Sequence, residues 1–198
     1  YSIEELAETG WFFDIITGAD SVMGQTGTVT VAAGDTKTLT FFNTQGAQII
    51  VAKNAYGPDG ATTSFDFDAS GGPSTITPDP FTLNGGQNMT LDSTEQVGYV
   101  RPGTYSIEEL AEMGWFFDGV GGADSVTGQK ATVTVAAGQK RTLTFYNTQG
   151  GQIKVTKVTT GPNGPTTDFD FTVMASYPEY EEEIQQVDPF NNSFTLKG

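Results

Sequence analysis

YSIEELAETGWFFD, at residues 1–14, recurs as YSIEELAEMGWFFD at residues 105–118. The two copies begin 104 residues apart, which is the length of a small domain. The likeness continues in three further pairs of segments: TVTVAAG at 28–34 and 132–138, LTFFNTQG at 39–46 and LTFYNTQG at 143–150, and GPDGATTSFDF at 57–67 and GPNGPTTDFDF at 161–171. Copies this close indicate duplication of a module of about 104 residues within a longer array.

Within one copy the pattern is that of short β-strands joined by tight turns. In QIIVAK, Ile49, Val51 and Lys53 fall on one face of an extended segment. SFDFD places Phe65 and Phe67 on one face, directly after a GPDG turn. About seven such strands per module, with no sustained helical period, predict an all-β β-sandwich.

The charge of the chain excludes several classes of partner. Nine Lys and Arg residues stand against 24 Asp and Glu residues, which gives a formal net charge of −15. A surface of this sign repels phosphate backbones and anionic lipid. We therefore expect no nucleic-acid partner, and we read most of the acidic excess as a solubilising surface.

The sequence has no cysteine and no histidine. This absence removes disulfides, thiolate nucleophiles, the usual zinc ligands and every histidine base. We expect no cofactor, no metal and no enzyme activity on another molecule. No apolar run reaches the roughly 20 residues that span a bilayer, so membrane insertion is not expected either. The sequence shows no signal peptide and begins inside a repeat, which suggests a processed or truncated chain.

The order of four short motifs resembles a known group of proteins. These motifs are I-x-V-x-K at 49–53, F-x-F at 65–67, PGTYSIEE at 102–109 and LTFYNT at 143–148. In this order and spacing they resemble the prealbumin-like, collagen-adhesin B-type domains of surface-protein stalks and pilins. The resemblance implies tandem immunoglobulin-like or prealbumin-like sandwiches and a mechanical role outside the cell. It covers essentially the whole chain.

The resemblance also implies a covalent cross-link. In that family, a lysine of the first strand is often joined to an asparagine of the last strand by an isopeptide bond, and a glutamate assists the reaction. The matching positions here are Lys53, Asn147 and Glu109, and a second set is Lys157, Asn43 and Glu5. Strand parity agrees with the first set, because all three of its residues fall on the inward faces of their strands.

Elementary chemistry explains how such a set could react. Burial disfavours both charged forms, so an enclosed Lys and Glu can exchange a proton and leave a neutral amine. The amine then attacks the Asn amide, a protonated Glu polarises the Asn carbonyl, and ammonia leaves. The alternative is an ordinary ion pair of Lys53 with Glu109, with Asn147 bonded to the backbone. A strand bulge would also exchange Glu109 for its neighbour Glu108.

Other motifs are weaker. Asn88 in N-M-T and Asn191 in N-N-S match the glycosylation sequon, so covalent glycans are a candidate modification. Four loop aspartates lack the dense spacing of a calcium loop, and we interpret them as solvated carboxylates. They are Asp14, Asp20, Asp118 and Asp124.

The module boundaries predict an unusual division of the chain. Residues 45–149 hold a complete set of strands, whereas 1–44 is the C-terminal half of a module and 150–198 the N-terminal half of another. We expect the two halves to be completed head-to-tail by neighbouring protomers, which gives a homopolymer by strand complementation. The alternative is that the sequence is an excerpt of a longer repeat protein, joined by ordinary peptide bonds.

Three functions compete at this point. The first is a structural subunit of an extracellular, pilus-like filament or cell-surface stalk, which the near-identical modules and the candidate cross-link favour. The second is a carbohydrate- or protein-binding adhesin module, which would need loops that vary between the copies. The third is a hydrolase with paired carboxylates, which needs a cleft that a small sandwich rarely offers.

Overall fold

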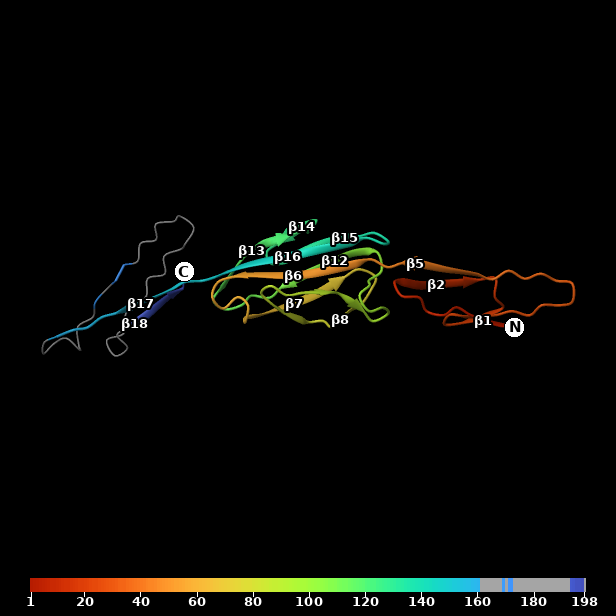
Figure 1. Ribbon diagram of the computed structural model, residues 1–198, viewed down its shortest axis with the longest axis horizontal. Helices are drawn as coiled ribbons and strands as arrows, with labels where there is room; N and C mark the ends of the chain where they lie inside the picture. The colour runs from red at the N-terminus through yellow and green to blue at the C-terminus, as the bar shows by residue number, and fades with distance from the viewer. Residues whose placement is uncertain (161–168, 170, 173–192, 198) are drawn as a thin grey trace. The chain divides into compact units, whose positions relative to one another are not determined.

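The computed structural model describes residues 1–160, 169, 171–172 and 193–197, and in these residues it is built from strands and turns. The all-β prediction is therefore confirmed. The chain divides into two compact units, residues 1–149 and 150–198. The first unit contains both the expected half-module and the complete module (Figure 1). In the described residues, no helix is long and apolar enough to cross a membrane.

The complete module is a sandwich of two sheets. One sheet has the order β10-β6-β16-β13 and the other β14-β15-β12-β7-β9, with a small β11-β8 pair beside them (Figure 1). The sandwich thus has more strands than the seven expected. The strands are β6 (Gln48–Tyr56), β7 (Ser64–Gly71), β8 (Ile76–Thr77), β9 (Phe81–Asn84), β10 (Asn88–Thr90), β11 (Asp92–Ser93), β12 (Gly103–Glu109), β13 (Trp115–Gly121), β14 (Ser125–Thr127), β15 (Lys130–Val135) and β16 (Lys140–Gln149).

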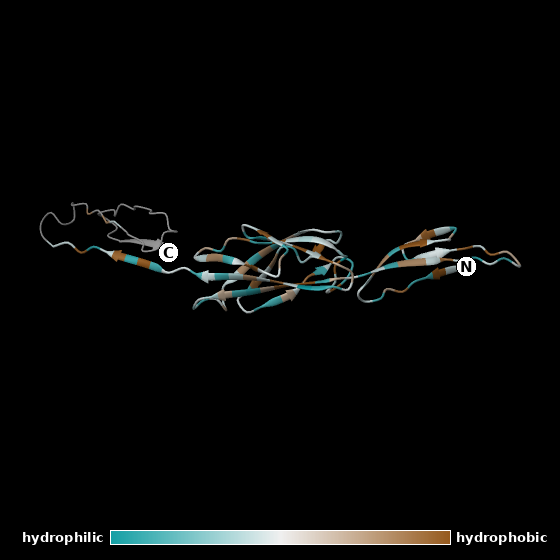
Figure 2. Cartoon of the chain, turned by 90° about the horizontal axis from the view of Figure 1, so that it is seen from above, coloured by the Kyte–Doolittle hydropathy of each residue, from teal (hydrophilic) through white to brown (hydrophobic). Residues whose placement is uncertain are grey.

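The core of this module follows the alternation seen in the sequence. Figure 2 shows polar and apolar positions banded along the strands, and the inward apolar set closes into one cluster. Its members all lie between Ala47 and Phe145, so the module has a core of its own. Phe67 packs edge-on against Phe145 of the opposite sheet, with ring centroids 5.1 Å apart. Aromatic contacts of this kind tie the two sheets together.

The first and last strands of the module lie side by side. β16 pairs with β6 in parallel, with Leu143 opposite Val51 and Phe145 opposite Lys53. In a parallel pair, the chain enters at one end of the sandwich and leaves at the other. Tension along the chain therefore acts across this one strand pair.

Residues 1–45 repeat the strand pairings of the second half of the complete module. The β1-β4-β3 sheet corresponds to β12-β15-β14, and the β2-β5 pair corresponds to β13-β16. Equal sequences thus give equal local pairings. The strands are β1 (Ser2–Glu4), β2 (Trp11–Thr17), β3 (Ser21–Met23), β4 (Thr26–Thr28) and β5 (Thr40–Gln45).

This N-terminal half-module leaves its core face open. Tyr1 and Ile3 are 83% and 41% exposed, whereas their equivalents Tyr105 and Ile107 in the complete module are fully buried. Residues 1–45 contain no counterparts of β6, β7 and β9, and their strands form two separate small sheets. An open apolar face with unpaired strand edges is a surface that another segment can complete.

The C-terminal unit pairs its strands differently from the complete module. β17 (Gln152–Thr156) is antiparallel to β18 (Ser193–Lys197). By sequence these strands match β6 and β9, which lie in different sheets of the sandwich. In this unit the two segments pair with each other instead.

Candidate functional site

The three residues predicted to react in the complete module meet inside its core. Lys53, Glu109 and Asn147 are 0%, 1% and 2% exposed, respectively. Lys53 Nζ donates a hydrogen bond of 2.5 Å to Asn147 Oδ1 and lies 3.1 Å from Glu109 Oε2. Asn147 Nδ2 donates a hydrogen bond of 2.5 Å to Glu109 Oε1. Each of the three side chains therefore contacts the other two.

Each residue reaches this site because of its place in its strand. Lys53 and Asn147 lie on the neighbouring strands β6 and β16, and Glu109 ends β12 of the opposite sheet. All three occupy inward positions in strands whose other inward positions are apolar. Polar groups in such positions must satisfy one another, because water cannot reach them.

Glu109, and not Glu108, is the inward carboxylate. Glu108 is exposed to solvent and forms a salt bridge of 2.8 Å with Lys130 on the neighbouring strand. The register of β12 against β15 runs without a break from Gly103 to Glu108. No bulge exchanges the two glutamates, so the parity prediction for Glu109 is the one that the structure shows.

The electrostatics of the site favour neutral partners. Desolvation lowers the pKa of Lys53, and the opposing attraction of Glu109 does not offset it. Desolvation likewise raises the pKa of Glu109 against the pull of Lys53 and Asn147. Both shifts favour moving a proton from the ammonium to the carboxylate, which leaves a neutral amine beside an amide carbon.

An aromatic ring lies over the lysine. The Nζ of Lys53 is 4.1 Å from the centroid of the Phe65 ring. Trp115 packs edge-on against the Phe65 ring itself, with centroids 5.2 Å apart. The sequence placed Phe65 in the core but did not reveal its contact with Lys53, because that contact joins strands of different sheets. The face of the Phe65 ring tolerates a cation at this distance.

The Asn147 amide lies between the other two residues. Its nitrogen contacts the carboxyl of Glu109, and its carbonyl oxygen faces Lys53. In this arrangement a protonated Glu109 could pass a proton to the departing nitrogen. Attack by Nζ on Cγ would form a C–N bond, the Cγ–Nδ2 bond would break, and Nδ2 would leave as ammonia.

The second predicted set is divided between the two units. Asn43 Nδ2 donates a hydrogen bond of 2.5 Å to Glu5 Oε1, as in the complete module. Asn43 is exposed, and Glu5 Oε2 is buried without a hydrogen-bond partner. Lys157 Nζ lies 4.1 Å from the Phe169 ring centroid, which matches Lys53 over Phe65.

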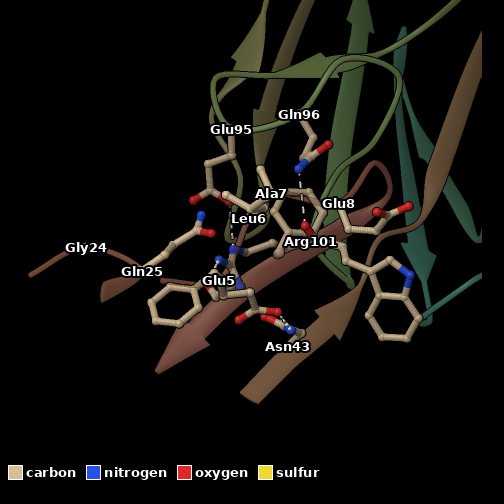
Figure 3. Close-up of a pocket in the computed structure, with 13 residues that line it drawn as sticks. Glu5, Leu6, Ala7, Glu8, Gly24, Gln25, Asn43, Glu95, Gln96 and Arg101 are labelled. Atoms are coloured by element: carbon tan, nitrogen blue, oxygen red, sulfur yellow. Dashed lines mark hydrogen bonds and ion pairs between the residues drawn. The ribbon is translucent and has the colours of Figure 1, made fainter. Parts of the chain in front are cut away.

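A cavity of about 290 Å³ opens beside Glu5 and Asn43 (Figure 3). Trp11, the equivalent of Trp115, lines it. In the complete module, the corresponding space beside Glu109 and Asn147 holds Lys53 and Phe65. Glu95, Gln96 and Arg101 of the complete module line the cavity as well.

The two candidate glycosylation sites differ in what the structure describes. Asn88 begins β10, pairs with Ala52 in the sheet and is exposed to solvent. Its position leaves the side-chain amide accessible. Asn191 lies outside the described residues.

The four loop aspartates hold the local structure. Asp14 and Asp118 accept hydrogen bonds from Thr44 and Thr148 hydroxyls. Asp20 and Asp124 accept them from the backbone amides of Thr30 and Thr134, each ten residues later in the chain. The described residues contain no group of three or more acidic side chains placed to hold a metal ion.

Comparison with known proteins gives weak structural likenesses. No family model and no curated protein matches the sequence. A pilus-presented adhesin, Spy0125, matches with a TM-score of 0.36 and 15% identity. An adhesin from Mobiluncus mulieris with disulfide, isopeptide and ester cross-links gives 0.40 and 16%, and the major pilin of Streptococcus pyogenes gives 0.32 and 15%.

These matches cover different shares of the chains. The Spy0125 match covers 52% of this chain and 27% of the adhesin. The Mobiluncus match covers 67% and 54%, and the pilin match 74% and 67%. This chain thus spans about a quarter of the first protein and about half of the second.

Proposed function

We propose that this protein is a structural subunit of an extracellular, pilus-like filament or cell-surface stalk, strengthened by an isopeptide bond between Lys53 and Asn147. The observation that carries the proposal is the enclosed contact of these two residues with Glu109. A set of three mutually bonded polar groups in an otherwise apolar core needs a purpose beyond packing. Bond formation turns the lysine amine into a neutral amide nitrogen, so the core no longer holds the positive charge of Lys53.

The position of the bond suits a load-bearing role. Lys53 and Asn147 lie on the first and last strands, which pair in parallel and take the tension along the chain. Hydrogen bonds between these strands can break under load, whereas an amide bond does not. The cross-link would serve as the staple that disulfides supply in other extracellular proteins.

Assembly would be head-to-tail and homopolymeric. The N-terminal half-module offers Glu5, Asn43 and an open cavity, and the C-terminal unit offers a lysine strand with Lys157 beside Phe169. Complementation of one copy's half-module by the strand of another is heterologous, so it repeats without closing. A bond from Lys157 to Asn43 would then make the filament covalent.

Intact-mass spectrometry with peptide mapping tests the proposal. We expect a mass below the sequence mass by about 17 Da for each ammonia lost. We also expect a tryptic cross-linked species that contains Lys53 and Asn147. The Lys53→Ala chain is the matched control and should show no deficit at this site. A wild-type chain with the full sequence mass and a free peptide ending at Lys53 would refute the bond.

A further inference from the structure

The loop at residues 95–101 of the complete module contacts the half-module at residues 1–45. Arg101 Nη1 lies 2.6 Å from Asp14 Oδ1, its Nη2 donates to the Phe13 carbonyl at 2.8 Å, and its guanidinium stacks 4.8 Å from the Phe12 ring centroid. Gln96 bonds both to the Gly10 amide and to the Trp11 carbonyl (Figure 3).

We call this contact between residues 10–14 and residues 96–101 the joint. The backbone conformation of Gly10 is part of it. Gly10 has a φ of +81°, and a side chain there would lie 3.2 Å from the Tyr99 ring. Only glycine allows this close approach with this backbone conformation. Phe12 is 2% exposed as a result. The joint therefore buries an aromatic ring and pairs a charge, which fixes one module against the next.

The complete module repeats the residues that form its neighbour's side of the joint, and within unit 1 no loop covers them. Gly114 repeats Gly10 with a φ of +86°, and a side chain there would meet nothing within 4 Å. Phe116, the equivalent of Phe12, is 42% exposed. Asp118 is held by Thr148 through a hydrogen bond of 2.8 Å, as Asp14 is held by Thr44. The face is formed before any partner arrives.

We propose that the face formed by Gly114, Phe116 and Asp118 is a docking surface for the Gln-Arg loop of another copy of this module, equivalent to residues 95–101. The occupant follows from the joint already present, where the identical residue types bind that loop. The arginine of that loop would pair with the carboxylate of Asp118. Its planar guanidinium would cover the exposed ring of Phe116. This inference does not depend on the isopeptide bond.

The test lengthens the full chain by one copy of residues 46–149, placed between Gln149 and Gly150. The inserted module contains its own closed core, and slow amide exchange at core residues such as Val51 reports its folding independently. We expect amide exchange at Gly114 to slow by about tenfold or more relative to the original chain, because the inserted glutamine accepts its hydrogen bond. Equal exchange in the two chains would overturn the proposal.

Matched substitutions show whether faster amide exchange comes from loss of the joint or from a general loss of stability. Asp118→Asn and Phe116→Ala should speed exchange at Gly114 in the lengthened chain and leave the original chain unchanged. In the original chain, Arg101→Gln should speed exchange at Gly10 by about tenfold, because the joint loses its charge pair. If Gly10 exchange is unaffected by Arg101→Gln, the loop does not hold the joint and the proposal fails.

Discussion

Asn43 donates its side-chain amide to Glu5 at 2.5 Å, the same contact that joins Asn147 to Glu109 one repeat later. Only the lysine differs, since Lys53 fills the site in the complete module and the equivalent place beside Asn43 is a cavity. The acceptor pair thus forms without its donor. A donor strand from another molecule would find the pair already arranged.

A mixture of two variants tests this completion. Asn43→Ala keeps only the donor Lys157, and Lys157→Ala keeps only the acceptor. Each alone should remain a monomer in boiling detergent, whereas the mixture should give a covalent dimer and nothing larger. Peptide mapping should show Lys157 joined to Asn43. The wild-type chain should give a ladder. If the mixture stays monomeric while the Lys53 bond is present, the assembly proposal falls and the stalk role remains.

The role of Glu109 in bond formation can be tested by comparing its substitution with that of its neighbour Glu108. Glu109→Gln keeps the size of the side chain but removes its ability to accept a proton from Lys53, so the mass deficit should disappear. Glu108→Gln loses only an exposed salt bridge with Lys130 and should keep the deficit. A deficit that survives Glu109→Gln would assign proton transfer to another group.

The cross-link should contribute strongly to stability. Lys53 and Asn147 are separated by 94 residues. By analogy with a disulfide that closes a loop of this length, the bond should add roughly 4 kcal/mol to the free energy of unfolding. Asn147→Ala should therefore lower the thermal midpoint of the complete module by more than ten degrees, roughly. Calorimetry that finds no decrease would show that no bond had formed in the parent chain.

Without the bond, stability should depend on pH in a particular way. In Asn147→Ala the raised pKa of Glu109 makes the folded state bind more protons than the unfolded state above pH 4.5, so stability falls as pH rises from there. The lowered pKa of Lys53 makes the folded state bind fewer protons below pH 10.5, so stability rises again towards that value.

The expected result is a minimum in the thermal midpoint between these two limits. The wild-type chain is the control, because an amide nitrogen does not titrate and the rise towards alkaline pH should be absent. A midpoint of Asn147→Ala that increases steadily from acid to neutral pH would contradict the burial of an unreacted pair.

Asn88 remains a candidate for glycosylation. Because its side chain is exposed at the start of β10, a glycan would not disturb the core. Enzymatic deglycosylation of the material from its source should lower the mass of the Asn88 peptide, and Asn88→Gln should abolish the change. Identical peptide masses before and after treatment would exclude a removable glycan at this position.

The sequence by itself determined the inward faces of the strands. Alternation in QIIVAK, TYSIEE and LTFYNT places Lys53, Glu109 and Asn147 among apolar residues, because side chains of an extended strand point to opposite faces with a period of two. Because the repeat gives β2 and β5 nearly the same sequences as β13 and β16, the two pairs of strands also pair alike. Both features are local, so a single copy of each segment contains the information.

Only the tertiary structure decided what these faces meet. The contact of Lys53 with Phe65, the orientation of the Asn147 amide towards Glu109, and the clamp of Arg101 on Asp14 and Phe12 each join strands or loops far apart in the chain. Alternation states that a residue points inward but not which residue lies opposite. That depends on how the two sheets and the two modules pack, and packing is a property of the assembled surfaces and not of any one strand.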